Sequence, residues 1–132
     1  MHWSSVAVVT KPAGLPISVG EIRAHLNLEG IPVDDGLLAR YIAGAVARID
    51  GPNGIGWAML AQTWRYTLDA FPYSVIELPG APVKGVASIS FENALGVTET
   101  VAPADYRVDL GRDPARISPA PGTSWPSARD VI

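Results

Sequence analysis

The hydrophobic pattern of the chain changes its period midway along the sequence. In the first part, apolar residues recur every three or four positions, the spacing of one face of an α-helix. The change falls in the run 59–71, MLAQTWRYTLDAF, where Trp64 and Tyr66 begin an alternation of apolar and polar residues. The pattern predicts an α+β fold: a small helical core of two helices (residues 18–58), followed by a β-rich antiparallel region (residues 59–118).

The first helix is predicted from its cap. Ser18 followed three residues later by Glu21 is a capping-box pattern, in which a hydroxyl accepts from a free amide and a carboxylate returns to the cap. A short helix from about residue 19 to 28 is therefore expected, ended by Gly30 and Pro32.

The second helix has the stronger pattern. Asp34 or Asp35 can cap it, because a carboxylate accepts from the orphan amides and suits the positive end of the helix dipole. Gly51 and Pro52 provide its stop signal. Its apolar residues form one stripe: Leu37, Leu38, Tyr41, Ile42, Ala45, Val46 and Ile49.

The remaining chain predicts short strands joined by turns. They are expected over residues 64–70, 74–78, 86–92, 97–101, 106–110 and 115–118, with a hairpin loop at 93–96. Residues 1–17 suit an extended N-terminal arm, and residues 119–132 a Pro/Gly-rich tail with no closing element.

Composition adds two constraints. Hydrophobic residues make up 48% of the chain and charged residues 17%, whereas about 25% charged residues is usual. This reflects either a Gly-, Ala- and Pro-rich composition or a surface partly covered by partner subunits. The net charge of −3 disfavours direct wrapping of nucleic acid.

Other classes are excluded or disfavoured. The absence of cysteine excludes disulfides, Cys-based zinc sites and thiol nucleophiles. No apolar run approaches the roughly 20 residues of a membrane helix, and residues 6–9 lack the flanks of a signal peptide. A soluble protein without membrane association is expected.

Candidate catalytic chemistry is sparse. His2 and His25 have no metal-ligand spacing. The Asp34–Asp35 pair is expected to cap a helix rather than to act as an acid/base pair. The lone G-x-G at residues 54–56 follows a helix and lacks a third glycine, so it is expected to be a loop. We expect no enzyme and no catalytic, cofactor or metal site.

Three aromatic residues, Trp64, Tyr66 and Trp125, are the candidate core or interface anchors. Two rival functions stay open at this point. A small carbohydrate-type binding module would use the same three side chains as an exposed stacking row. A hydrolase would need two convergent carboxylates from among Asp34, Asp35 and Asp69.

Several short runs, taken in order and spacing, carry a resemblance to one family. The match spans about residues 16–126. The runs are Pro16-Ile17-Ser18 with Glu21 and Ala24-His25-Leu26, Asp34-Asp35 with Leu37-Leu38 and Ile42, Gln62-Thr63-Trp64-Arg65 with Leu68-Asp69 and Phe71-Pro72, Leu78-Pro79 with Pro82-Val83, Ala104-Asp105-Tyr106, and Ala120-Pro121-Gly122 with Ser124-Trp125-Pro126. With these runs the chain resembles the head-tail connector (adaptor) proteins of long-tailed double-stranded DNA phages, prophages and gene transfer agents.

The resemblance implies a structural, non-catalytic virion protein of the head-tail neck, assembled in the bacterial cytoplasm. Such subunits form a homo-oligomeric ring, commonly a dodecamer, below the portal protein. The ring extends the channel through which double-stranded DNA passes without sequence-specific binding, and it meets a neck stopper or tail-completion protein.

The chain departs from this family at its C-terminus. Longer members usually continue into another strand and a C-terminal helix that packs on the first helices, and residue 132 comes before both. On the family's pattern, either a neighbouring subunit supplies the missing face of the helical core or the chain is a truncated form.

Overall fold

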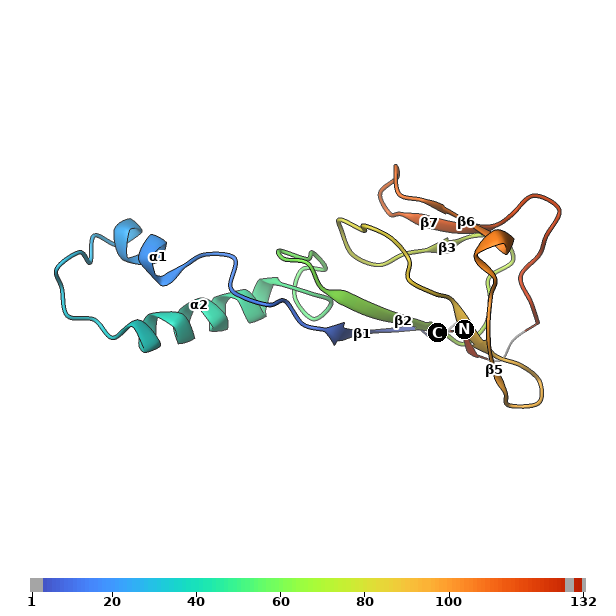
Figure 1. Cartoon of the computed structure of the whole chain (residues 1–132), viewed down its shortest axis with the longest axis horizontal. Coiled ribbons are helices and arrows are strands. Elements are labelled where there is room, and N and C mark those ends of the chain that lie inside the picture. Colours follow the sequence, from blue (N-terminus) through green and yellow to red (C-terminus); the bar gives the residue numbers. More distant parts are fainter. Residues whose placement is uncertain (1–3, 128–129, 132) are drawn as a thin grey trace.

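The computed structural model describes residues 4–127 and 130–131, and it confirms the predicted α+β class. The two helices lie at one end of an elongated molecule and the two sheets at the other, and strands β1 (Ser4–Thr10) and β2 (Thr63–Leu68) of the larger sheet extend toward the helices (Figure 1). The order of elements follows the change of hydrophobic period that the sequence shows.

Helix α1 (Val19–His25) begins with the predicted capping box. The Ser18 hydroxyl accepts from the Glu21 amide at 3.1 Å, and the Glu21 carboxylate accepts from the Ser18 amide at 2.7 Å and from its hydroxyl at 2.8 Å. The helix ends three residues before the predicted boundary. The reason is local, because Asn27 adopts a left-handed conformation with φ 53°, which stops the helical path.

Replacing Ser18 with alanine is expected to fray α1 and to raise the pKa of Glu21. Two hydrogen bonds to the Glu21 carboxylate hold that pKa below its ordinary value: the larger effect comes from the Ser18 backbone amide and the smaller from the Ser18 hydroxyl. Because the pKa of Glu21 is lower in the folded protein, its carboxylate contributes to folding stability at pH values above the ordinary carboxyl pKa. That contribution is lost as the pH falls through the lowered pKa of the folded state. An NMR titration of Glu21 in both proteins measures this; an unchanged Glu21 pKa in Ser18→Ala would contradict it.

Helix α2 (Asp35–Ile49) starts at Asp34, whose carboxylate accepts from the Gly36 amide at 3.0 Å. Asp35 instead forms an ion pair with Arg23 of α1 at 2.6 Å. The Arg23 guanidinium also donates to the carbonyl oxygens of Ile31, at 3.2 Å, and Val33. One arginine therefore ties α1 to the connecting loop and to the first turn of α2.

The far end of α2 is connected to the sheet by polar side chains. The Asp50 amide donates to the Val46 carbonyl at 2.7 Å, which caps the helix, and Gly51 has φ 80°, as the predicted stop signal requires. The Asp50 carboxylate accepts from the Met59 amide at 2.7 Å and from the Gln62 side-chain amide at 2.9 Å. These bonds fix the loop that leads into β2.

The larger sheet is antiparallel and has the order β1-β2-β8-β4-β5. Strand β1 pairs with β2 along its whole length, from Ser4 opposite Leu68 to Thr10 opposite Thr63. The strands are β1 (Ser4–Thr10), β2 (Thr63–Leu68), β4 (Ser90–Glu92), β5 (Thr98–Thr100) and β8 (Asp130–Val131). The predicted hairpin is confirmed, because Phe91 lies opposite Glu99 and the Asn93 amide donates to the Val97 carbonyl at 3.0 Å.

The smaller sheet has the order β3-β7-β6 and is also antiparallel. Its strands are β3 (Ile76–Glu77), β7 (Arg116–Pro119) and β6 (Tyr106–Asp109), and the short 3-10 helix η1 (Pro103–Asp105) precedes β6. An ion pair between Arg116 and Glu77, 2.7 Å apart, joins β7 and β3.

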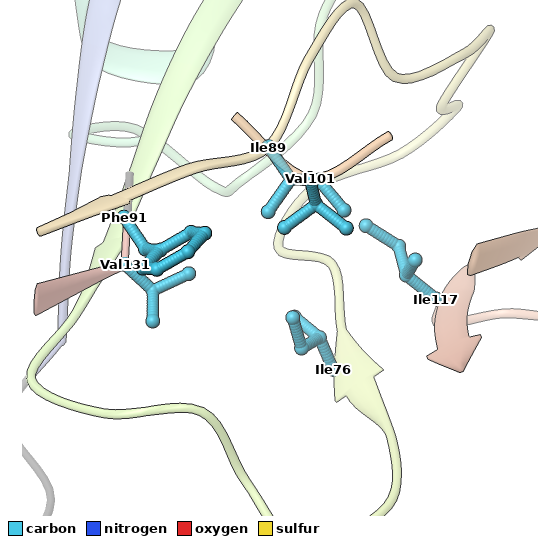
Figure 2. Packing of buried hydrophobic residues seen from close by; sticks show 6 residues of the cluster. All are labelled: Ile76, Ile89, Phe91, Val101, Ile117 and Val131. Carbon is cyan, nitrogen blue, oxygen red and sulfur yellow. The ribbon is translucent and has the colours of Figure 1, made fainter. Parts of the chain in front are cut away.

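The hydrophobic core lies between the two sheets, and strands of both contribute to it (Figure 2). Figure 2 shows the cluster of six buried side chains: Ile76, Ile89, Phe91, Val101, Ile117 and Val131. Burying one face of each sheet against the other gives the sheets their main stabilisation, since apolar burial contributes about 25 cal/mol per Å².

Three expectations are corrected. The tail over residues 119–132 does contain a closing element, because β8 inserts between β2 and β4, with Val131 opposite both Leu68 and Phe91. The N-terminal arm is extended as predicted, but it lies in the sheet as edge strand β1. The strand predicted over residues 86–92 is regular only from Ser90, because the preceding residues have no strand paired to them within the described chain.

Candidate protein-interaction surfaces

The molecule exposes more surface than a compact protein of its mass. Its accessible area is 8982 Å², whereas a compact monomer of 13.9 kDa exposes roughly 6,700 Å². The surplus of roughly 2,300 Å² exceeds two interfaces of about 800 Å² each, the size of one side of a standard protein contact. The elongated arrangement in Figure 1 accounts for it, since the helices stand away from the sheets.

Much apolar surface lies on the helical pair. Within α1, all of which the structure describes, no side chain is buried. Of the described residues of α2, Leu38 and Ile42 are buried, while Tyr41 on the same stripe is 67% exposed. Leu26, just after α1, is 53% exposed. Two helices with so little mutual burial leave most of their apolar stripe facing solvent, and exposed apolar patches of this kind are typical of interaction surfaces.

The two helices and their flanking loops enclose a groove of about 480 Å³. We call it the helical groove. Every residue that lines it is apolar: Pro16, Ile17, Ile22, Leu26, Leu38, Tyr41, Ile42, Ala45, Val46, Ile49 and Met59. A groove with no charged or hydrogen-bonding side chain except one tyrosine hydroxyl suits an apolar protein segment better than a polar small molecule.

The three candidate anchor residues face the protein interior. Tyr66 packs against the core cluster. The Trp64 indole N–H donates to the Gln62 side-chain oxygen at 2.7 Å, and its ring lies over Gly80. The Trp125 ring stacks on Phe71, with centroids 4.9 Å apart and planes 8° apart, and its N–H donates to the Ser74 carbonyl at 3.2 Å. All three are half-buried, so they do not form the exposed aromatic row that the carbohydrate-binding alternative requires.

The large side chains that are exposed to solvent are not the three candidate anchors. Tyr41 lies on the predicted stripe of α2, so periodicity places it on an apolar face but cannot show whether anything covers that face. Trp57, in the loop after α2, is 58% exposed, and Leu95 at the tip of the β4–β5 hairpin is 87% exposed. Neither belongs to a periodic run, so the sequence carries no signal of their exposure.

The Asp and His residues considered as catalytic or metal-binding groups either have structural roles or do not cluster with one another in the described part of the chain. Asp34 caps α2 and Asp35 pairs with Arg23, as described above, so the expected capping role is confirmed. Asp69 also interacts within the described chain. His25 lies exposed in the last turn of α1, and His2 lies outside the described residues. Across residues 4–127 and 130–131, no three His, Asp or Glu side chains gather where they could hold a metal ion.

Comparison with known proteins identifies no relative: no family model, no curated protein and no solved structure matches the chain. Neither of the two helices in the described part of the chain is long and apolar enough to cross a membrane.

Proposed function

We propose that this protein is a structural subunit that assembles into a ring, as the head-tail connector of a long-tailed phage, prophage or gene transfer agent. In this role it joins the portal protein to the neck stopper or tail-completion protein, and DNA passes through the ring. The subunit has no catalytic function in this proposal. The observation that carries it is the uncovered apolar face of the helical pair.

The surplus surface supports assembly through two faces. A ring subunit contacts a neighbour on each side through different, heterologous patches. The surplus of roughly 2,300 Å² is enough for two standard faces of about 800 Å². The helical groove supplies an apolar patch for one of them, and the low charged share of the chain, 17%, suits a surface that is covered in the assembly.

The carbohydrate-binding alternative has less support, because Trp64, Tyr66 and Trp125 pack within the protein. A hydrolase using Asp34 or Asp35 also has less support, because the Asp34 carboxylate caps α2 and the Asp35 carboxylate is paired with Arg23. Neither alternative accounts for the exposed helical face.

Assembly is tested with Tyr41→Asp. At high concentration we expect the unmodified protein to form a closed ring, visible by negative-stain electron microscopy and as a defined mass by analytical ultracentrifugation. The aspartate places an unpaired carboxylate in the apolar face of the helical pair, which a neighbouring subunit covers in the proposed ring. We expect this change to weaken assembly at least tenfold.

The matched control is Ala47→Asp. Ala47 is exposed on the same helix but does not line the helical groove, so the same charge is expected to leave assembly unchanged. Circular dichroism of both variants checks that α2 is retained. A protein that stays monomeric at every concentration, or a Tyr41→Asp variant that assembles as well as Ala47→Asp, would overturn the proposal.

A further inference from the structure

The turn that follows α2 contains the single Asn-Gly pair of the chain, Asn53-Gly54. The Gly54 amide donates to the Gly51 carbonyl at 3.1 Å, so residues 51–54 form a β-turn with Asn53 in its third position. The same carbonyl also accepts from the Gly56 amide at 3.2 Å. The Gly54 nitrogen is therefore held by one hydrogen bond, and it shares the acceptor of that bond with another donor.

The fold requires glycine at position 54. A Cβ on Gly54 would lie 2.3 Å from the Ile49 carbonyl oxygen and 2.9 Å from the Asp50 carbonyl oxygen, both in the backbone at the end of α2. The turn folds back on this helix end, where the Ile55 amide donates to the Ile49 carbonyl at 2.9 Å. Asn53 is thus followed by the one residue type that has no side chain to shield its own backbone nitrogen.

The Asn53 side chain is not engaged by the fold. It is exposed, and it has no hydrogen bond to any residue in the part of the chain that the structure describes. Asparagine is among the chemically labile residues, because its side-chain amide can be lost. An exposed, unbonded side chain beside an unshielded backbone nitrogen is the arrangement in which this loss is fastest.

The two other asparagines of the chain provide the contrast. The Asn93 side-chain oxygen accepts from the Leu95 amide at 2.9 Å and from the Val97 amide at 3.1 Å, which holds the side chain in the hairpin turn. Asn27 is followed by Leu28, whose side chain hinders approach to its own nitrogen. Neither has the combination that is found at Asn53.

From these observations we infer that Asn53 is a site of spontaneous deamidation. The Gly54 nitrogen forms a bond to the Asn53 Cγ and closes a succinimide ring, and the side-chain nitrogen leaves as ammonia with the proton that the Gly54 nitrogen loses. Water then opens the ring. Attack at Cγ gives aspartate, and attack at the backbone carbonyl carbon gives isoaspartate, in which the main chain runs through Cγ. Water is the only co-reactant.

The turn sets the rate of this reaction in the folded protein. The Gly54 nitrogen donates to the Gly51 carbonyl, so it reaches the Asn53 Cγ only when that hydrogen bond opens. The reaction takes place within one chain and needs no partner. The inference therefore goes beyond the proposed ring, and it holds or fails independently of ring assembly.

Either product alters the end of α2. Each adds one negative charge to the net charge of −3, close to the C-terminal end of the helix, where the dipole disfavours an anion. Isoaspartate also lengthens the main chain by one atom where Gly54 already lies against the Ile49 carbonyl. We expect this extra atom to break the hydrogen bond from the Ile55 amide to Ile49.

The test is incubation of the purified protein at neutral pH, followed by peptide mass spectrometry that distinguishes asparagine, aspartate and isoaspartate. We expect Asn53 to be converted roughly tenfold faster than Asn27 and Asn93 of the same molecules. Conversion of Asn53 should be faster still in urea, where the turn is unfolded. The Asn53→Ser protein is the control, and it should not gain the acidic form that ion-exchange chromatography separates from the unmodified protein.

Asn53→Asp separates the added charge from the added main-chain atom. In this variant the main chain is unaltered, so the Ile55 amide should keep its protection from hydrogen exchange, whereas the isoaspartate form should lose it. The inference is overturned if Asn53 in the folded protein is converted no faster than Asn27 and Asn93, or if urea leaves its rate unchanged. Full protection of Ile55 in the isoaspartate form would contradict the expected change at the end of α2.

Discussion

Phe91→Ala is expected to lower the free energy of unfolding by about 3–5 kcal/mol, the usual cost of removing a buried aromatic ring. Phe91 lies in the centre of β4, 6% exposed, and its ring meets Phe71 edge-to-face with centroids 5.8 Å apart. It also lies opposite Val131 of β8, so its loss opens a cavity where the closing strand packs. Urea denaturation followed by tryptophan fluorescence measures the change.

Such a loss approaches the whole stability of a small domain, which is about 5–15 kcal/mol. Phe91→Leu therefore provides a second variant that should fold and lose less than half as much. Leu95→Ala is the control, because Leu95 is 87% exposed and its truncation should change stability by less than about 0.5 kcal/mol. If Phe91→Ala were no more destabilising than Leu95→Ala, that result would contradict the burial of Phe91 between the two sheets.

Gly80→Ala is expected to cost about 2–4 kcal/mol, the sum of a strained backbone and a steric overlap. Gly80 has φ +84°, and a Cβ there would lie 2.1 Å from the Trp64 ring. The ring cannot move freely, because its indole N–H is bonded to Gln62, which is bonded in turn to Asp50 at the end of α2. The same denaturation experiment measures the loss.

Gly30→Ala separates the two causes. Gly30 has φ +76°, but no atom lies within 4 Å of the place that a Cβ would take, so its substitution should show the backbone strain alone, about 1–2 kcal/mol. Equal losses for Gly80→Ala and Gly30→Ala would mean that the Trp64 ring does not pack against Gly80.

Local signals in the sequence determined where the helices begin and which class the fold belongs to. The Ser18 and Glu21 pair, the Asp34 cap and the Gly51 stop each depend on residues within a few positions of one another, so the sequence contains the whole interaction. The hairpin between β4 and β5 was predicted for the same reason, because its turn residues and flanking alternation are contiguous.

Contacts between distant segments were decided only by the tertiary structure. Nothing in the short run at Asp130–Val131 predicts a strand, and β8 exists because it pairs with β2, more than 60 positions earlier, and with β4. The exposure of Tyr41 and the half-burial of Trp64 follow in the same way from what packs against them. Periodicity gives the face on which a side chain lies, but burial depends on a second surface, and that surface is distant in sequence.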